Sequence, residues 1–283
     1  MRMLARVACV VAAAVAAGSA APVAQSRSPL PTVPQLLAAA AKYVAEYDKK
    51  FSAVVSEEKY EQVVTQSTGF RAQQRRTLVS DVILINAGEA GWISLRDVYQ
   101  VDGSPVRDHT DRLLKLLTNP APDAYQQALR LAQEGARFNI GSMSRSINVP
   151  STALRFVRQE NQSHSSFSVA GMKTIDGVNT AELAFTETGT PRLIRSPADA
   201  PADGKVWLEP ASGRIVQTEL SLKFEKNSSA KITVHYGADA KIGMWVPVRM
   251  DEVYILALGQ VVSGRADYRN FRTFSVDVNT IIK

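Results

Sequence analysis

The chain has 283 residues, with 33 basic and 27 acidic side chains and a formal net charge of +6. This small positive excess does not indicate a nucleic-acid-binding protein, in which Lys and Arg gather strongly on one surface, but it suits contact with an anionic surface. A single cysteine, Cys9, excludes a disulfide within the chain and any cysteine-based metal cluster.

The N-terminal segment has the three parts of a secretory signal peptide. A basic start is followed by an uncharged run, Val7–Gly18, and then by small residues. The run is shorter than the roughly 20 residues that cross a bilayer. A lipid-modified Cys9 is an alternative, but this cysteine lies near the start of the run and not at its end. We predict a signal peptide over residues 1–24 and a mature protein that is periplasmic or secreted.

Residues 25–283 contain no Gly/Ser-rich or Pro-rich linker and no internal repeat of fixed period, so we predict a single domain. Helical spacing begins after Thr32, a suitable N-cap. One apolar face then repeats every three or four residues as Val33, Leu36, Leu37, Ala40, Ala41, Val44, Tyr47 and Phe51. This pattern predicts an amphipathic helix that packs on the rest of the protein.

The next segments alternate between strand and helix patterns. Residues 52–86 are rich in Val, Thr, Tyr and Ile and predict two strands, and the stretch GWISLRDVYQVDGSPVRD predicts a hairpin around Asp102 and Gly103. Helical patterns follow over residues 109–119 and 123–139. The stretch NVPSTALRFV predicts a short helix with Ser151 as its cap.

From about Ser165 to the C-terminus the pattern is almost wholly that of strands. Short turns rich in Gly, Asn, Ser and Asp separate them, including a second Asp-Gly turn at Asp176 and Gly177. Neighbouring strands joined by such short connections pair antiparallel in a meander. We therefore predict an α+β fold with a large, strongly curved antiparallel sheet and a few helices on one face.

Motifs of the common enzyme classes are absent from the sequence. It contains no Gly-x-Ser-x-Gly elbow, no His-Glu-x-x-His helix and no phosphate-binding Gly loop that ends in Lys-Ser/Thr. His109 lies beside Asp108 and Asp111, which suggests an acid/base or metal cluster or, more simply, a capped and charge-complemented helix start. We predict no catalytic, cofactor-binding or metal-binding residues.

Two groups of residues keep other functions open. Four carboxylates, Glu209, Glu219, Asp251 and Glu252, could meet in the fold as the acid and base of a hydrolase. Three tryptophans, Trp92, Trp207 and Trp245, each stand near the start of a predicted strand beside apolar residues. They pack in the core or line an apolar cavity of the size of a lipid, and we take them as the candidate cavity-lining residues.

The stretch VWLEPASGRIVQTEL predicts a strand, a tight turn and a returning strand. Pro210 fixes φ at the first corner of the turn, and Gly213 permits a left-handed conformation at its end. This hairpin resembles the Trp-x-Asp-Pro-x-Thr-Gly turn of the periplasmic lipoprotein-localisation (Lol) carriers. Glu209 stands where those proteins have Asp, and Ser212 where they have Thr.

Other stretches, RDVYQVDGSPVRD, ARFNIG and YRNFRTFSV, are similar to uncharacterised exported proteins of acidobacteria-type bacteria. The resemblance to Lol carriers implies an incomplete β-barrel that covers helices, with an apolar cavity for acyl chains and no cofactor. The helices would act as a lid whose packing competes with the ligand. No residues beyond the turn can be matched one by one.

These observations predict an exported, non-enzymatic binding or carrier protein for a lipidated or apolar partner in the cell envelope. Its expected partners are a lipid or lipoprotein and a membrane surface, without nucleic acid, and we expect a monomer. The first alternative is a structural or interaction module of the envelope. The second is the carboxylate-dependent hydrolase.

Overall fold

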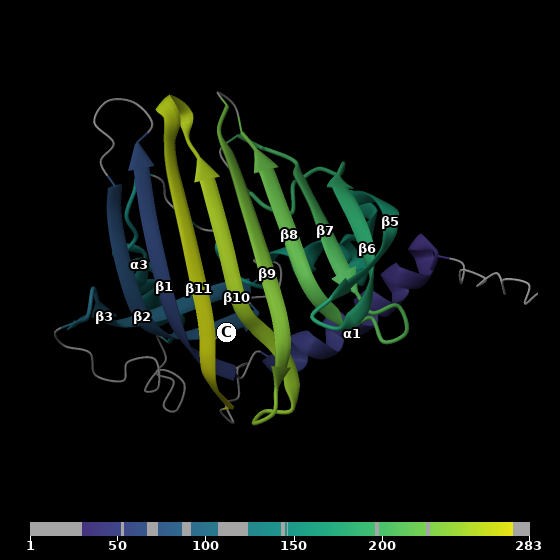
Figure 1. Cartoon of the computed structure of the whole chain (residues 1–283), viewed down its shortest axis with the longest axis horizontal. Helices are drawn as coiled ribbons and strands as arrows, with labels where there is room; N and C mark the ends of the chain where they lie inside the picture. Colours follow the sequence, from purple (N-terminus) through teal and green to yellow (C-terminus); the bar gives the residue numbers. More distant parts are fainter. Residues whose placement is uncertain are drawn as a thin grey trace, which may run out of the picture.

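The computed structural model describes residues 30–51, 54–66, 73–86, 92–106, 124–142, 145, 147–195, 198–224 and 227–273. In this part of the chain one antiparallel sheet of 11 strands forms the front of the molecule, and the helices lie behind it (Figure 1). The predicted α+β fold, an incomplete barrel with a few helices on one face, is confirmed.

The helical elements are α1 (Val33–Phe51), α3 (Ala124–Ala136) and the short 3-10 helices η2 (Thr152–Val157), η3 (Gln159–His164) and η4 (Ala257–Gly259). The strands of the N-terminal part are β1 (Val54–Gln66), β2 (Gln73–Asn86), β3 (Trp92–Val101) and β4 (Ser104–Pro105). Those of the C-terminal part are β5 (Ser165–Ile175), β6 (Val178–Glu187), β7 (Ala202–Leu208), β8 (Ile215–Lys223), β9 (Ser229–Asp239), β10 (Met244–Ile255) and β11 (Gln260–Thr273).

The sheet consists of two meanders joined side by side. Strands β1 to β4 pair in chain order, and so do β5 to β11, as the short turns between them predicted. The meanders meet where β1 pairs with β11, from Val54 opposite Thr273 to Gln66 opposite Gln260. The described sheet ends at β4 on one side and β5 on the other, so it stays open.

Helix α1 forms where the sequence predicts it, and it buries the predicted face. Its buried residues are Leu36, Ala40, Ala41, Val44, Tyr47 and Phe51. The N-terminus is closed by a bond from the Thr32 backbone N–H to Gln35 Oε1 at 3.0 Å, which is half of a capping box. Lys49 and Lys50 in the last turn complement the helix dipole.

Both predicted Asp-Gly turns are hairpin turns. Asp102 and Gly103 have φ values of 49° and 82°, and Asp176 and Gly177 have 47° and 79°. Left-handed conformations at both central residues define the turn type that matches the twist of two adjacent strands. The sequence therefore fixes the β3–β4 and β5–β6 connections locally.

Alternation along the strands assigns their side chains to two faces. On β8 and β9, Leu220 and Ile232 are buried in the same apolar core as α1, whereas their neighbours Glu219 and Lys231 reach solvent. Successive side chains of a strand point to opposite sides. Below, the side that faces the helices is called the interior, and the other side is called the outer face.

One local prediction is wrong. The short helix of the NVPSTALRFV stretch forms as η2, a 3-10 helix, but Ser151 makes no capping hydrogen bond with its side chain. Its φ and ψ values, −96° and 2°, lie outside the extended region that an N-cap residue adopts. The predicted signal peptide, Cys9, His109 and the predicted helix over residues 109–119 lie outside the described residues.

Candidate functional site

The interior of the sheet is divided into two regions of different chemistry. Over β6 to β9 it carries apolar side chains that lie against α1 and η2, and we call this region the apolar half. Over β10, β11, β1 and β3 it carries polar and ionisable side chains, and we call this region the charged half. Its residues include Glu58, Tyr60, Gln62, Arg96, Glu252, Tyr254 and Tyr268.

The apolar half is filled by contacts between the sheet and the helices behind it. The sheet contributes Leu183, Phe185, Val206, Leu208, Leu220, Leu222, Ile232 and Val234 to the same core cluster as the buried face of α1. Phe156 of η2 stacks on Phe185 with ring centroids 4.5 Å apart, and Tyr47 of α1 meets Tyr236 edge-on at 6.4 Å. Burial of apolar area, which is not directional, therefore holds α1 in place.

The β7–β8 hairpin is the docking point for the middle of α1. Its turn is closed by bonds from Glu209 N–H to Arg214 O and from Gly213 N–H to Glu209 O, each 2.9 Å long. Gly213 has a φ of +73°, and a Cβ atom there would lie 2.1 Å from Ala39 O of α1. Glycine is thus required both by the backbone conformation and by the contact with the helix.

Two further contacts hold this hairpin in shape. The Arg214 guanidinium lies 4.5 Å from the centre of the Trp245 ring and 3.3 Å from Glu209 Oε1. The Ser212 hydroxyl bonds to the other oxygen of Glu209. Glu209 and Arg214 thus form the rim of this tight turn.

The charged half is centred on Arg145, whose side chain is only 1% exposed. It enters the interior from the segment between α3 and η2. The guanidinium donates hydrogen bonds to Tyr60 Oη at 2.6 Å and to Glu252 Oε1 at 3.1 Å, and it also bonds to the Gln62 side chain. Tyr254 Oη donates to Glu252 Oε2 at 3.0 Å, so both carboxylate oxygens of this buried glutamate are bound.

A second buried ion pair lies beside the first. Arg96 donates to Glu58 through Nε at 2.7 Å and Nη2 at 3.1 Å, and Nη2 also donates to Asn148 O at 3.0 Å. Burial alone would lower the pKa of Arg96, but the Glu58 carboxylate outweighs it and raises this pKa. The pair is bidentate, the strongest arrangement of these groups.

Both ion pairs hold the described residues between α3 and η2 (138–142, 145 and 147–150), which we call the plug segment. Arg145 itself belongs to it, and Arg96 bonds to its Asn148 carbonyl. Its ends are bound as well: Arg76 donates to Phe138 O at 3.1 Å, and Tyr236 Oη donates to Pro150 O at 2.7 Å. The plug segment is therefore attached by polar bonds to several strands. Helix α1 packs through its apolar face, and its polar bonds run to the η2–η3 region, where Asp48 pairs with Arg158 at 2.6 Å and Leu37 O accepts a bond from Gln162 at 3.2 Å.

The tyrosines of the charged half stay protonated at neutral pH. Burial raises the pKa of Tyr60, Tyr254 and Tyr268, and the nearby carboxylates Glu252 and Glu58 raise it further. The hydroxyl groups of Tyr60 and Tyr254 consequently donate hydrogen bonds to Glu252 and do not act as bases. This arrangement is suited to holding a segment of chain in place.

The predicted cavity-lining tryptophans are placed as follows. Trp207, 4% exposed, packs with Ile175 and Val216, while its neighbours Val206 and Leu208 belong to the core around α1. Trp207 therefore faces the outer side of β7. Trp245 packs partly against the same cluster, and the side chain of Trp92 lies outside the described residues. That the three tryptophans line a cavity stays a prediction.

Polar contacts on the outer side explain how Trp207 is covered. Its Nε1 donates to Glu182 Oε2 at 3.0 Å. The ammonium groups of Lys173 and Lys205 lie 5.5 and 5.8 Å from the centre of its ring. These distances are typical of cation–π contacts, so the indole is enclosed by long side chains.

The four carboxylates of the predicted hydrolase alternative do not converge. Glu252 is in the interior, and its chain neighbour Asp251 is on the outer face with Arg249 at 2.6 Å and Arg265 at 3.0 Å. Glu219 pairs with Lys231 at 2.8 Å, and Glu209 belongs to the β7–β8 turn. Each carboxylate is engaged with a basic side chain of its own neighbourhood.

The predicted alternative of a cluster at His109, Asp108 and Asp111 lies outside the described residues. His235 lies on the outer face of β9, where burial and the charge of Arg249 lower its pKa. Among the described residues, no group of three or more His, Cys, Asp and Glu side chains could hold a metal ion. None of the helices in this part of the chain combines the length and the apolar character needed to cross a membrane.

The sequence did not predict the charged half as a group. On β1, Glu58, Tyr60 and Gln62 alternate with Glu57, Lys59 and Glu61, so polar residues occupy both faces. Alternation normally separates a polar face from an apolar one. The only signal in the sequence was the long run of polar residues on this strand, within a segment rich in Val and Thr. This run does not identify Arg145 or Glu252 as the residues that bind to it.

Comparisons with known proteins give a distant structural likeness. No protein-family model matches the chain, and no curated protein does. Solved structures similar to it include a LolA superfamily protein from Nitrosomonas europaea, with 11% identity, a TM-score of 0.34 and coverage of 90% of this chain and 99% of that one.

Two other solved structures also resemble the chain distantly. A DUF1329 family protein from Desulfovibrio piger has 10% identity, a TM-score of 0.39 and coverage of 87% of this chain and 97% of that one. Pseudomonas aeruginosa MucB, solved in complex with MucA, has 9% identity, a TM-score of 0.22 and coverage of 84% and 99%. Likeness at this level assigns no function. The expected similarity to acidobacteria-type proteins stays a prediction.

Proposed function

We propose that this protein is an exported carrier that binds a lipidated or otherwise apolar partner in the cell envelope. In the absence of the partner, α1 covers the surface that the partner would contact. The observation that carries this proposal is the build of the apolar half, an open sheet whose apolar interior is covered by the amphipathic helix α1 together with η2. Helices in apolar grooves and acyl chains both bind through non-directional burial, so one can replace the other.

The exchange requires no chemical reaction. Displacement of α1 exposes its own apolar face and that of the sheet, and a bound acyl chain covers the sheet again. Transfer to an acceptor then depends on the difference in affinity between carrier and acceptor. No cofactor is needed for this cycle.

The proposal includes the expected processing of the chain. Cleavage of a signal peptide over residues 1–24 would leave a single, monomeric domain of residues 25–283 in the periplasm or outside the cell. N-terminal sequencing of the exported protein, together with its mass in solution, tests these statements. A retained leader or an intracellular location would contradict them.

A direct test measures ligand binding and the state of α1 together. The purified protein is analysed by native mass spectrometry with and without a diacylated peptide, and amide hydrogen exchange is followed in residues 33–51. We expect a one-to-one complex and faster exchange in α1 when the amphiphile is bound. An absence of complex, or a complex with unchanged exchange in α1, would rule out the proposed exchange.

A matched pair of variants on α1 tests the same point without a ligand. Ala40 is buried in the apolar half, and Ala45 is exposed on the opposite side of the helix. Ala40→Glu places a charge in the interior and should release α1, because a buried unpaired carboxylate is strongly unfavourable. Binding of an apolar fluorescent probe should then rise several-fold, with the sheet still folded by circular dichroism. Ala45→Glu should leave probe binding unchanged.

A second candidate function follows from the edge of the sheet. In the described part of the chain β5 pairs with β6 alone, which leaves the other edge of β5 open. An open strand edge can accept a strand from another protein. A structural or interaction module of the envelope would use this edge, and crosslinking in cells from position Lys173 of β5 would recover its partner. Recovery of the protein alone would count against this function.

A further inference from the structure

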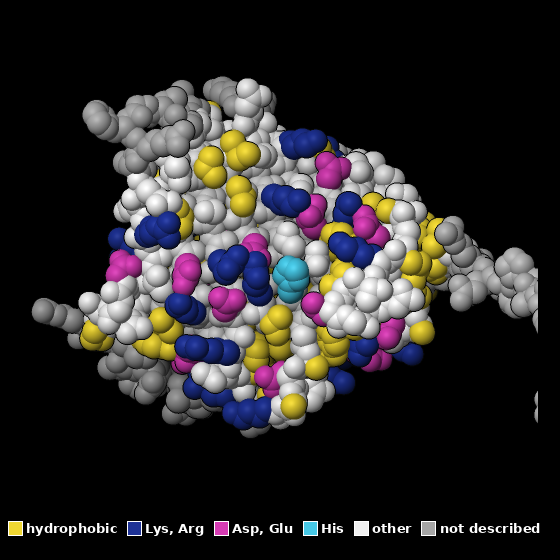
Figure 2. Space-filling view, in the orientation of Figure 1, with side chains coloured by type: hydrophobic (Ala, Val, Ile, Leu, Met, Phe, Trp, Pro, Cys, Tyr) yellow, Lys and Arg dark blue, Asp and Glu magenta, His cyan; other side chains and the backbone are white. Residues whose placement is uncertain are grey.

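The outer face of the sheet carries a small apolar patch where β10 ends and β11 begins. Hydrophobic side chains gather over this end of the two strands (Figure 2). Strand pairing brings together four aliphatic residues there, namely Val63 of β1, Val261 of β11, and Val253 and Ile255 of β10. Val253 and Ile255 are 41% and 44% exposed. We call these four residues the end patch.

Both sides of this hairpin end are apolar, although only one side faces the interior. On the interior side, Tyr254, Val262 and the partly buried Leu256 pack in a small apolar cluster. The end patch lies on the other side, because successive side chains of a strand alternate. No residue from Val253 to Gly264 is charged. Solvated faces of antiparallel sheets normally carry polar residues, so packing of the interior does not explain the end patch.

The turn between β10 and β11 holds the end patch in a fixed shape. The turn is closed by bonds from Leu256 N–H to Gln260 O at 2.8 Å and from Gly259 N–H to Leu256 O at 3.1 Å. It is also tied to the β8–β9 turn, where the Ala257 N–H donates to Ser228 Oγ at 3.0 Å. The patch is therefore formed before any partner arrives, and binding requires little loss of conformational entropy.

Strand register gives the order of outer-face residues from this end of the sheet inward. The first row across the strands is uncharged and consists of Gln73, Thr65, Val261, Ile255 and Ser229. The second row has a basic residue at each end and consists of Arg75, Val63, Ser263, Val253 and Lys231. In the third row Arg265 lies opposite Glu61 and Asp251. Basic residues thus border the end patch on both flanks and behind it.

The basic side chains of this border reach farther into solvent than their acidic partners. Lys231 is 56% exposed and its partner Glu219 is 22% exposed. The corresponding values for Arg265 and Asp251 are 52% and 30%. Arg75 is exposed and bonds to a neutral amide side chain. A surface that approaches the end patch therefore meets positive charge beside apolar side chains.

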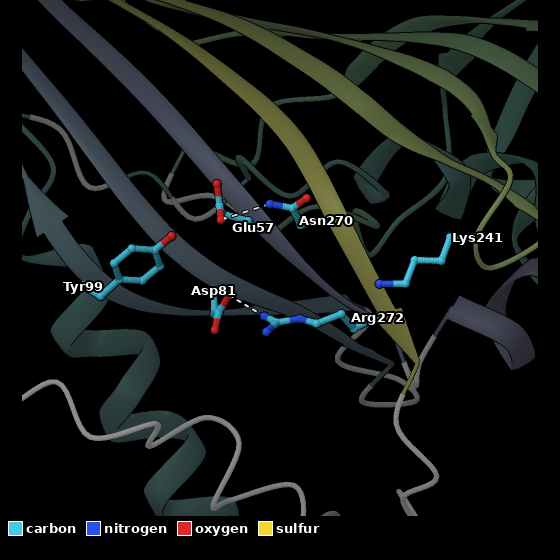
Figure 3. A pocket seen from close by; sticks show the side chains of 6 residues that line it. All are labelled: Glu57, Asp81, Tyr99, Lys241, Asn270 and Arg272. Carbon is cyan, nitrogen blue, oxygen red and sulfur yellow. Dashed lines mark hydrogen bonds and ion pairs between the residues drawn. The ribbon is translucent and has the colours of Figure 1, made fainter.

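The opposite end of the outer face is built differently. A groove of about 470 Å³ lies there, and most of its lining side chains are charged or polar (Figure 3). Asn270 bonds to Glu57 at 3.2 Å and Arg272 bonds to Asp81 at 2.6 Å, so these groups satisfy one another. The two ends of the outer face thus differ in polarity, and the end patch is suited to an apolar partner.

We propose that the end patch docks the protein on the surface of a phospholipid bilayer, with Arg75, Lys231 and Arg265 at the lipid phosphates. A strand rises about 3.3 Å per residue, so the third row lies about 13 Å behind the first. Apolar side chains of interfacial segments enter a bilayer by about 5–10 Å, and long basic side chains extend to the headgroups. This docking goes beyond the carrier function, because it requires no displacement of α1.

The size of the end patch favours a bilayer over another protein. A stable protein interface uses roughly 20–30 residues on each side, whereas the end patch has four aliphatic residues and is bordered by charges. A bilayer needs only a few apolar side chains with basic residues beside them, because the apolar and electrostatic contributions add. The arrangement therefore matches a lipid surface that carries negative charge.

The first test measures binding to vesicles in a sedimentation assay. Phosphatidylcholine vesicles with and without phosphatidylglycerol are compared, and we expect tighter binding to the anionic ones. Ile255→Ser should weaken binding to both about tenfold, because one aliphatic side chain no longer enters the bilayer. Arg75→Gln should weaken binding about fivefold for the anionic vesicles alone.

A matched control lies at the other end of the same strand. Val248 of β10 is 37% exposed, and Val248→Ser should leave vesicle binding unchanged. Because Ile255 and Val248 are both exposed, neither replacement should affect folding, which circular dichroism checks. An absence of vesicle binding, or equal losses in the two serine variants, would overturn the proposal.

Two further measurements separate this proposal from its alternatives. If light scattering shows a dimer that Ile255→Ser dissociates, and vesicles are not bound, the end patch joins two copies of the chain and the proposal is wrong. The complex with a diacylated peptide should form equally in Ile255→Ser and in the unsubstituted protein. Loss of vesicle binding with this complex intact is the expected result, whereas loss of both in Ile255→Ser would assign the end patch to the carrier site and not to membrane docking.

Discussion

The two halves of the interior lie on the same open sheet, but different interactions hold the segments that cover them. In the apolar half, α1 is held by side chains such as Leu36 and Val44 that need no specific partner. In the charged half, the plug segment is held by Arg145 and Arg96, each bound to a buried glutamate. A helix held by burial can be exchanged for another apolar surface, whereas removal of a buried ion leaves its partner uncompensated. Under the proposed function, α1 is therefore the exchangeable cover and the plug segment the fixed one, and the exchange of α1 must also break the ion pair of Asp48 with Arg158 at 2.6 Å.

Removal of Arg145 should have the largest effect. Arg145→Met leaves Glu252 buried without its cation, and the free energy of unfolding should fall by about 3–5 kcal/mol, as measured by urea denaturation. The double variant Arg145→Met with Glu252→Gln removes both charges and should recover a large part of this loss. A single-variant loss below about 1 kcal/mol, the size of an exposed pair, would mean that the charged half does not fix the plug segment.

Disruption of the contact between α1 and the β7–β8 hairpin should lower the free energy of unfolding by an intermediate amount. Gly213→Ala imposes a side chain at a φ of +73° and at 2.1 Å from Ala39 O, whereas Gly243→Ala imposes one at a φ of +66° with open space around it. The second variant measures the backbone cost alone, about 1–2 kcal/mol. Gly213→Ala should cost about 1–3 kcal/mol more, with faster hydrogen exchange in α1. Equal losses in the two variants would show that the hairpin does not position the helix.

The smallest loss of stability is expected when a core side chain of the apolar half is replaced by one of similar volume and different shape. Leu220 is 1% exposed and belongs to the apolar core against which α1 packs. Leu220→Met conserves volume and should cost less than about 1.5 kcal/mol, while Leu220→Ala should cost about 2–5 kcal/mol because it leaves a cavity. Thermal unfolding of both variants checks this order. A large loss for the methionine variant would mean that the apolar half requires a specific shape, contrary to an exchangeable cover.

Much of the fold could be predicted from the sequence, since its signals are local. The stripe of apolar residues predicted α1 and its buried face, and the Asp-Gly pairs predicted two hairpins. Pro210 and Gly213 predicted the β7–β8 turn, although not that Gly213 also touches α1. The Ser151 cap was wrong because the start of a 3-10 helix in a buried corner is decided by its surroundings and not by the cap residue.

Less of the candidate site could be predicted. The tryptophans were chosen as large apolar residues near strand starts, yet the alternation of β7 puts Trp207 on the face away from α1. The buried ion pairs join residues far apart in the chain, such as Arg145 with Glu252 and Arg96 with Glu58. Side chains of this type are usually exposed, so their pattern in the sequence predicts a solvent face.

The sequence by itself determined the classes of the elements and the turns between neighbours, because helix spacing, strand alternation and turn residues act over a few positions. The tertiary structure alone decided that β1 pairs with β11, which joins the two meanders into one open sheet. Packing against α1 and the plug segment decided which face of each strand became the interior, and hence where the apolar half and the charged half lie. Such contacts join distant segments, and no local pattern records which segments will meet.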